Sequence, residues 1–257
     1  MIKNYTIVLL AIITKIKNWP QVLFAKIFDR KIENIVLRNG LNIHVDDKIG
    51  KADLSMFSEI FYKQYYNPEG LEINNGDIVF DIGANNGFFS YFASQKNKTG
   101  KIYTFEPLPV LADKIKKTVE INNIKNIILE NFAVGNDAVN PIKFYVSNTH
   151  NGCHSLYSRD NTNTMIDVNI INLKKYCNLK NINKIDFLKL DCEGAEYEIM
   201  TQEDMEFIKN TVSKISMEYH DDINDHKHEE IVDLLIKNDF RVSVKDGYIY
   251  AINSRNH

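Results

Sequence analysis

From residue 77 onward, short apolar runs alternate with segments in which apolar residues recur at helical spacing. The runs are rich in Ile, Val, Leu and Phe and are bounded by turn residues, which is typical of buried strands. Strands that alternate with helices predict a mainly parallel sheet covered on both faces. We expect strands at 77–81, 101–106, 127–133, 185–191 and 214–220, and helices at 88–95, 109–122, 195–208 and 227–238.

The end of the chain departs from this alternation. Arg241–Val244 and Tyr248–Ile252 are two β-type runs separated only by a short turn around Asp246-Gly247. A connection this short joins neighbouring strands only when they are antiparallel. The sequence therefore predicts an α/β fold whose parallel sheet carries an antiparallel strand near its C-terminal end. Earlier, β runs at Ile142–Val146 and Met165–Ile171 interrupt the alternation around a polar loop.

The first seventy residues follow a different pattern. Residues 1–30 and 54–66 favour helices, and between them two β runs flank Asn39-Gly40, which is a strong hairpin signal. We therefore divide the chain into an N-terminal helical and hairpin extension, residues 1–70, packed on a main domain, residues 71–257.

Composition and charge narrow the classes of function. The chain has 257 residues, 44% hydrophobic and 25% charged, as in an ordinary globular protein, and its net charge is −3. Because there is no global basic field, we expect no nucleic-acid partner. Cys153, Cys177 and Cys192 form no CxxC pair, so we expect neither a disulfide framework nor a zinc site. A reduced, cytoplasmic compartment fits this cysteine content best.

The apolar stretch Ile7–Ile13 lies among lysines at positions 3, 15 and 17. It is too short to span a bilayer and lacks a small-residue cleavage site, so we expect neither a transmembrane helix nor a signal peptide. Two interpretations remain open. The stretch is a helix packed on the domain or on a partner, or it makes a peripheral membrane contact together with Trp19 and Phe24.

The most specific local pattern is the junction between the first strand of the main domain and its helix. The strand ends in Asp81, glycines follow at Gly83 and Gly87, and a helical pattern begins at once. Glycine lets the backbone approach a ligand closely, and a helix start offers unpaired N–H groups. The next strand ends in Glu106, at the spacing where a carboxylate binds a ribose diol in nucleotide-binding folds. The junction therefore predicts a cofactor that contains a nucleoside.

The other strand ends indicate one shared site. Ligands bind beyond the carboxyl ends of parallel strands. The five predicted ends, most of them polar or ionisable, are Asp81, Glu106, Ala133, Asp191 and His220. Polar and ionisable residues are uncommon in buried strands without a functional role, so we expect these residues to meet at one edge of the sheet.

The glycine turn also distinguishes between cofactors. A dinucleotide needs Gly-x-Gly-x-x-Gly to seat its pyrophosphate, whereas Asn85 stands in the place of the second glycine and Asp81 would repel phosphate. S-adenosylmethionine carries a sulfonium and an amino group and no phosphate. Asp81 could attract its cationic end while Glu106 hydrogen-bonds its ribose. An NAD-dependent oxidoreductase and a noncatalytic scaffold that keeps the fold remain as alternatives.

Four motifs, in their order and spacing, resemble the FkbM family of S-adenosylmethionine-dependent methyltransferases. They are Asp81–Ser90, Phe105–Pro109, Glu130–Gly135 and Ile185–Glu196. The resemblance implies a Rossmann-like class I methyltransferase fold with a seven-stranded, mainly parallel sheet whose last strand is antiparallel. It also implies O-methyl transfer, to a sugar hydroxyl of a glycan or to a small natural product.

The same resemblance assigns cofactor-binding residues. Matched to the family motifs, the residues that hold S-adenosylmethionine are Asp81, Gly83, Asn85, Gly87, Glu106, Pro107, Phe132 and Ala133. Phe132 and Ala133 fall where the adenine ring is held, so Phe132 either stacks on adenine or is a core aromatic residue. Asp191–Glu196 is the motif beside the transferred methyl group.

Methyl transfer to a neutral hydroxyl requires alignment of the two reactants, and a base assists it. We expect Glu193 or His220 to act as the base, with Asp191 orienting groups near the methyl. Glu193 and Glu196 are three apart at the start of a predicted helix and so share one face. We assign no metal ligands. The alternative is that Asp191, Glu193, Glu218 and His220 hold Mg²⁺ or Mn²⁺, which prefer oxygen-rich sites.

The polar loop Ser147–Arg159 is the remaining candidate for function. Inserted loops often carry specificity, and the Tyr and Asn side chains of this loop suit sugar hydroxyls. We expect it to be a lid that binds the acceptor, a hydroxyl-bearing glycan or small molecule.

Overall fold

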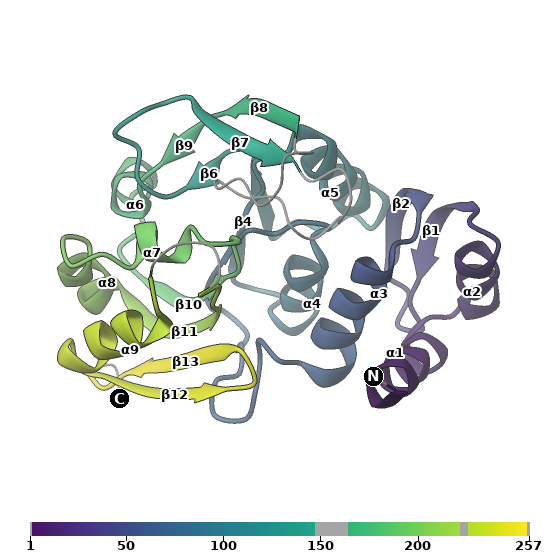
Figure 1. Cartoon of the computed structure of the whole chain (residues 1–257), viewed down its shortest axis with the longest axis horizontal. Coiled ribbons are helices and arrows are strands. Elements are labelled where there is room, and N and C mark those ends of the chain that lie inside the picture. The colour runs from purple at the N-terminus through teal and green to yellow at the C-terminus, as the bar shows by residue number, and fades with distance from the viewer. Residues whose placement is uncertain (1, 147–163, 222–225, 256–257) are drawn as a thin grey trace.

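The computed structural model describes residues 2–146, 164–221 and 226–255, and its centre is a seven-stranded sheet (Figure 1). The strand order is β12-β13-β11-β10-β3-β4-β5. All neighbours from β11 to β5 pair in parallel, and β13 is antiparallel to both β11 and β12. The bounds are β3 Ile78–Ile82, β4 Lys101–Phe105, β5 Ile127–Glu130, β10 Ile185–Leu190, β11 Val212–Glu218, β12 Phe240–Lys245 and β13 Tyr248–Asn253. The predicted fold class is confirmed, including the antiparallel last strand.

Helices cover both faces of this sheet. Figure 1 shows α6 (Leu173–Lys180), α8 (Met205–Thr211) and α9 (His228–Lys237) on one side, and α4 (Phe88–Lys96) with the N-terminal elements on the other. The helix α5 (Pro109–Ile121) lies on the α4 side, since its Ile115 packs in the same hydrophobic cluster. Successive side chains of a strand point to opposite faces. In β3, Val79 packs in the α4 cluster and Phe80 in the opposite one, and both are fully buried.

Several elements differ from the sequence-based expectation. The strand expected at 127–133 splits into β5 and the two-residue β6 (Ala133–Val134), which pairs with β9 (Ile170–Ile171). It breaks at Asn131, whose side-chain amide donates to the carbonyls of Glu106 and Pro107. The single helix expected at 195–208 is two helices, α7 (Glu196–Ile199) and α8.

Helix α6 was not expected at all. Its first turn is capped by Asn172, whose side chain accepts from the backbone N–H of Lys175. Asn is a favoured N-cap residue, so the sequence does contain this start signal. The neighbouring hairpin of β7 (Ile142–Val146) and β8 (Thr164–Val168) agrees with the predicted β runs.

The N-terminal residues form the predicted helices and hairpin. They comprise α1 (Ile2–Lys15), α2 (Trp19–Ile27), β1 (Lys31–Val36), β2 (Asn42–Lys48), α3 (Lys51–Ser58) and a π-helical turn η1 (Glu59–Lys63). The strands β1 and β2 are antiparallel. One hydrophobic cluster runs from Ile12 through Phe57 to Phe88 and Phe89 of α4. The division at residue 70 is therefore crossed by a continuous core.

Several apolar side chains of the first two helices face solvent. The most exposed ones are Tyr5, Leu9, Leu10, Phe24, Ile27 and Phe28. Across the described residues, the helices are too short or too polar to cross a membrane. Peripheral membrane contact through this segment stays a prediction.

Replacing Phe57 by Ala tests whether the N-terminal segment and the main domain unfold together. Phe57 is fully buried and its ring lies 4.9 Å from that of Phe61 and 5.9 Å from that of Phe88. We expect the variant to lose about 3–5 kcal/mol of unfolding free energy in a single transition in urea. The matched control is Phe28→Ala, which removes an exposed ring and should cost less than about 1 kcal/mol. A separate early transition for Phe57→Ala would show that the two parts unfold independently.

Candidate active site

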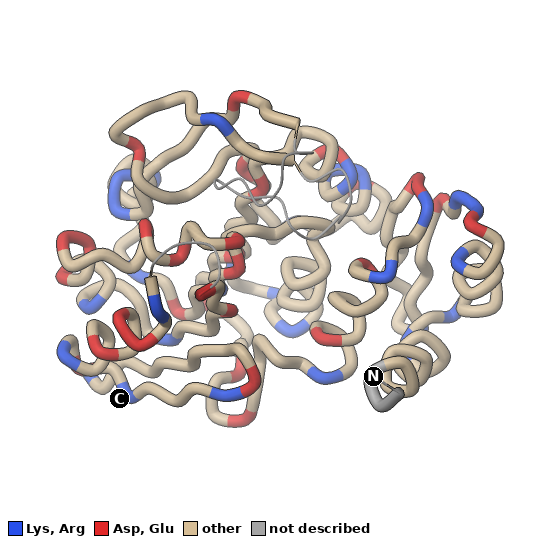
Figure 2. Tube along the Cα trace, in the orientation of Figure 1, with Lys and Arg blue, Asp and Glu red and all other residues tan. Residues whose placement is uncertain are grey.

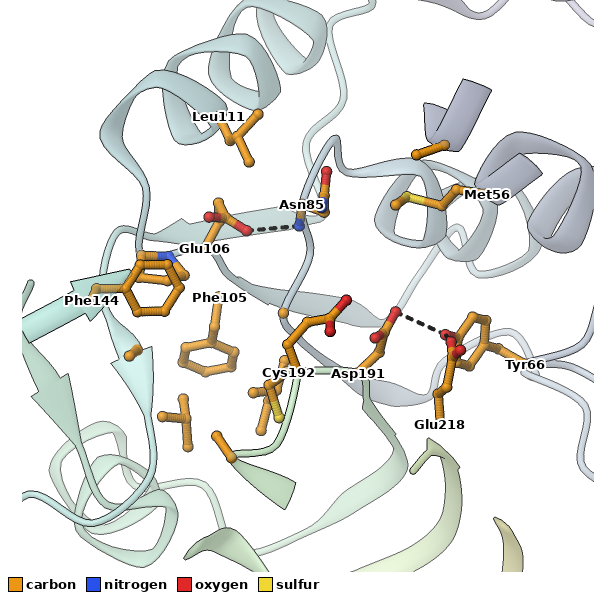
Figure 3. A pocket seen from close by; sticks show the side chains of 18 of the residues that line it. Met56, Tyr66, Asn85, Phe105, Glu106, Leu111, Phe144, Asp191, Cys192 and Glu218 are labelled. Atoms are coloured by element: carbon orange, nitrogen blue, oxygen red, sulfur yellow. Dashed lines mark hydrogen bonds between the residues drawn. The ribbon is translucent and has the colours of Figure 1, made fainter. Parts of the chain in front are cut away.

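A pocket of about 290 Å³ opens at the carboxyl ends of β3, β4, β10 and β11 (Figure 3). This volume is close to the lower end of the range for small-molecule sites, about 300–1,000 Å³. The predicted site residues that line it are Gly83, Asn85, Glu106, Pro107, Phe132, Ala133, Asp191 and Glu193. Most of the predicted strand-end residues are therefore brought together, as expected. Asp81, Gly87 and His220 lie outside the lining.

The turn after β3 is shaped by two glycines with positive φ. A Cβ on Gly83 would lie 1.9 Å from the backbone oxygen of Asp191, so only glycine lets the β3 turn pass this close to the end of β10. A Cβ on Gly87 would lie 2.7 Å from the ring of Tyr91. Gly87 is the N-cap of α4, so its part in the site is to set the path of the turn. Asn85 lies between the two glycines with a φ of 52° and lines the pocket.

Glu106 sits at the middle of the pocket, directly after β4. One carboxylate oxygen accepts from the N–H of Asn85 at 2.7 Å and the other from the N–H of Leu108 at 2.9 Å. Each oxygen can accept a second bond, so the carboxylate retains capacity for a ribose diol. Burial raises the pKa of Glu106 to about 8, although the two N–H groups oppose that shift.

Apolar and aromatic side chains form the pocket on one side of Glu106. Figure 3 shows Phe105 and Phe144 there, with Leu111 above. Phe132 also lines this end, and its ring centre lies 5.8 Å from those of both Phe105 and Tyr176. Phe132 thus belongs both to the core and to the pocket wall, and the surface it completes suits a flat heterocycle.

Asp81 is fully buried beneath the pocket. Its carboxylate accepts from the hydroxyl of Ser90 at 2.6 Å and pairs with the ammonium of Lys189 at 3.1 Å. Burial alone would lower the pKa of Lys189, but Asp81 and Asp191 outweigh burial and raise it above its usual value. The expected direct contact of Asp81 with the cationic end of the cofactor has no support from this placement, because Asp81 already faces a cation inside the protein.

Acidic groups gather on the other side of Glu106. Asp191, Glu193, Glu218 and Glu59 line this end, and Figure 2 shows acidic positions clustered at the centre of the molecule. The hydroxyl of Tyr66 lies 2.8 Å from Asp191 and 2.7 Å from Glu218. Tyr66 reaches the site from the segment before the main domain, and no local pattern around it predicts this position.

His220 is held between two carboxylates. Its Nδ1 lies 3.2 Å from Glu196 and its Nε2 lies 3.6 Å from Glu193. Burial lowers the pKa of an imidazole, but the hydrogen bond to Glu196 and the charges of Glu196 and Glu193 prevail and raise the pKa of His220 to about 10. The ring is therefore a cation at neutral pH. An imidazolium has no lone pair to accept a proton, so this placement does not support the expectation that His220 is the base.

The expected helical face of Glu193 and Glu196 is also corrected. Helix α7 begins only at Glu196, and Glu193 lies in the preceding turn with a φ of 54°. The buried carboxylate of Glu196 accepts from the N–H groups of Cys192 and Gly194. Glu196 therefore closes the turn, while Glu193 faces the pocket.

Three residues of the alternative metal site lie close together. Ligand atoms of Asp191, Glu193 and His220 are within 4.8 Å of one another. His220 also pairs with both Glu193 and Glu196, and we assign no metal ligands. The predicted acceptor lid, Ser147–Arg159, lies outside the described residues.

The parallel sheet, the Gly83–Gly87 turn and the strand-end carboxylate Glu106 together define a Rossmann-like methyltransferase. The sequence profile described as "Methyltransferase FkbM domain" matches residues 81–242, well over half of the chain. The protein belongs to the FkbM methyltransferase family, and S-adenosylmethionine is its methyl donor. The resemblance found in the sequence is thereby confirmed.

Two relatives and one solved structure show how far the similarity extends. The 31-O-demethyl-FK506 methyltransferase FkbM of Streptomyces tacrolimicus is 26% identical over 250 residues, which cover 86% of this chain and 93% of that protein. Methyltransferase 1 of Beauveria bassiana is 22% identical, covering 72% and 82%. The crystal structure of methyltransferase FkbM from Methylobacillus flagellatus aligns with a TM-score of 0.45 and 13% identity, over 79% of this chain and 55% of that one.

The pH dependence of stability tests the burial of Glu106. The pKa of Glu106 is about 8 in the folded protein, against a value of 4.5 for an unperturbed glutamate. The folded state therefore holds the proton more tightly than the unfolded state does, and the free energy of unfolding falls as pH rises from about 5 to 8. In the wild type, this fall in the free energy of unfolding is on the order of a few kcal/mol. We expect it to be absent in Glu106→Gln, whose side chain does not titrate. Urea unfolding of the wild type and of Glu106→Gln at several pH values checks this. All other titratable groups are present in both proteins, so the difference between the two stability curves reports on Glu106. Parallel curves would show that Glu106 is not buried as a protonated acid.

Proposed function

We propose that the protein transfers a methyl group from S-adenosylmethionine to a hydroxyl oxygen of a small natural product or of a sugar. The observation that carries this proposal is the division of the pocket by Glu106 into an aromatic end and an acidic end. The name of the Streptomyces relative describes a methylation on oxygen of a natural product, which supports the same class of acceptor here.

The two ends differ in the chemistry that they can bind. Phe105, Phe132 and Phe144 offer apolar surface for adenine, and Glu106 offers acceptor capacity for the ribose hydroxyls. The acidic end would then receive the methionyl part, whose sulfonium is positive. Opposite charges at that end favour this orientation over the reverse one, because the aromatic end has no carboxylate besides Glu106 among its described lining residues.

The residues of the acidic end have separate tasks in this proposal. S-adenosylmethionine supplies an electrophilic methyl group when it is bound. Asp191 would orient groups beside that methyl, since its carboxylate is fixed by Tyr66 and lies 3.6 Å from Lys189. Glu193 lines the pocket but is paired with His220.

Calorimetry with S-adenosylhomocysteine and with NAD tests the proposed cofactor orientation. We expect S-adenosylhomocysteine to bind, NAD not to bind, and Glu106→Ala to weaken the binding of S-adenosylhomocysteine by about 10- to 100-fold, since leaving buried polar groups without their partner costs about 1–3 kcal/mol. The acceptor is then sought by mass spectrometry as a gain of one methylene, about 14 daltons, among glycans and small hydroxylated metabolites.

Each alternative function has its own outcome. An oxidoreductase would bind NAD, and a noncatalytic scaffold would bind S-adenosylhomocysteine without ever producing a methylated acceptor. A protein that binds neither ligand would contradict the proposal outright.

A further inference from the structure

A single hydroxyl lies between two carboxyl groups at the acidic end. The Tyr66 oxygen is 2.8 Å from Oδ2 of Asp191 and 2.7 Å from Oε2 of Glu218. A phenol has only one hydrogen to donate. The hydroxyl can donate that hydrogen across only one of the two short contacts. In the other contact, a lone pair of the Tyr66 oxygen faces a carboxyl oxygen and repels it unless that oxygen carries a proton. The arrangement is therefore stable only when one of the two carboxyl groups carries a proton and donates it to Tyr66.

The surroundings decide which carboxyl group holds that proton. Asp191 has the ammonium of Lys189 at 3.6 Å, whereas Glu218 has no ion-pair partner within 4 Å among the described residues. Burial, together with the negative charge of Asp191, raises the pKa of Glu218 to about 7. Glu218 is thus the group that gains and loses a proton near neutral pH.

Charged and titratable groups from every neighbouring element face this pair. They are Glu59 of η1, Lys189 and Asp191 at the end of β10, His220 after β11 and Tyr248 of β13. Lys189 and His220 are cations, and Glu59 and Asp191 oppose the charged form of Glu218. Tyr248 is buried and its pKa lies above its usual value because of burial, so it stays neutral.

We propose that Glu218 is the general base of the methyl transfer and that Tyr66 is the residue that positions it. This inference rests on the proposed function and deepens it. Glu218 lines the pocket and would accept the proton as the acceptor O–H bond breaks. The acceptor oxygen bonds to the methyl carbon, the carbon–sulfur bond breaks, and its electron pair stays on sulfur. The sulfonium and the carboxylate charges disappear together, so the step is balanced.

A comparison of two ligands measures the charge of Glu218 without an acceptor. S-adenosylmethionine and S-adenosylhomocysteine share their adenine, ribose, amino and carboxylate groups and differ in the charged sulfonium. Contributions from Glu106 therefore cancel in the ratio of their affinities. We expect this ratio to shift about tenfold in favour of S-adenosylmethionine as pH rises from 5.5 to 8.5, with a midpoint near 7, because a charged Glu218 attracts the sulfonium.

Three variants test whether Glu218 is the group that causes this pH dependence. Glu218→Gln should make the ratio independent of pH, because the charge is removed while the shape is kept. When Glu218 loses its proton, the Tyr66 hydroxyl turns its hydrogen to the charged carboxylate. Tyr66→Phe should therefore move the midpoint to higher pH, because this hydrogen bond to the charged Glu218 is lost. The control Tyr250→Phe removes a nearby hydroxyl that bonds to the carbonyl of Tyr65, and its midpoint should equal that of the wild type.

Turnover on the acceptor found by mass spectrometry then tests the base role. We expect Glu218→Gln to lower kcat by about 10²- to 10⁴-fold with little change in KM, and to abolish the rise of rate between pH 6 and 8. A wild-type ratio of affinities that is flat with pH, or unchanged kcat in Glu218→Gln, overturns this inference while leaving the methyltransferase intact. Failure of both ligands to bind would instead overturn the proposed function.

Discussion

The buried ammonium of Lys189 holds the two halves of the active site at a fixed spacing. The register of the parallel strands places Lys189 opposite Asp81, and its Nζ also lies 2.8 Å from the carbonyl of Gly83 and 3.6 Å from Asp191. A buried charge without partners is costly, so the ammonium requires the turn after β3 and the end of β10 to remain together. Gly83 permits this approach because any side chain there would overlap the backbone of Asp191.

The acidic end depends on a segment that precedes the parallel sheet. The π-helical turn η1 ends at Gln64, which has a left-handed backbone, and the chain then carries Tyr66 to the carboxylates of Asp191 and Glu218. The Lys189 ammonium lies 5.4 Å from the centre of the Tyr66 ring. The same cation thus lies against both the turn after β3 and the residue that links the two carboxylates.

The sequence predicted the features that depend on local pattern and strand order. Apolar alternation located every strand of the main sheet, and the strand-end rule brought Glu106, Ala133 and Asp191 to one pocket. It did not show which side chains meet across the fold. Asp81 pairs with Lys189, His220 lies between Glu193 and Glu196, and Tyr66 lies 125 residues before Asp191 in the chain. Such contacts leave no periodic trace in a sequence.

A crystal structure of the complex with S-adenosylhomocysteine tests the proposed orientation of the methyl donor. We predict the ribose hydroxyls on the carboxyl group of Glu106, adenine among Phe105, Phe132 and Phe144, and sulfur on the side of Asp191, Tyr66 and Glu218. Sulfur at the aromatic end, or a ribose that makes no contact with Glu106, would contradict it.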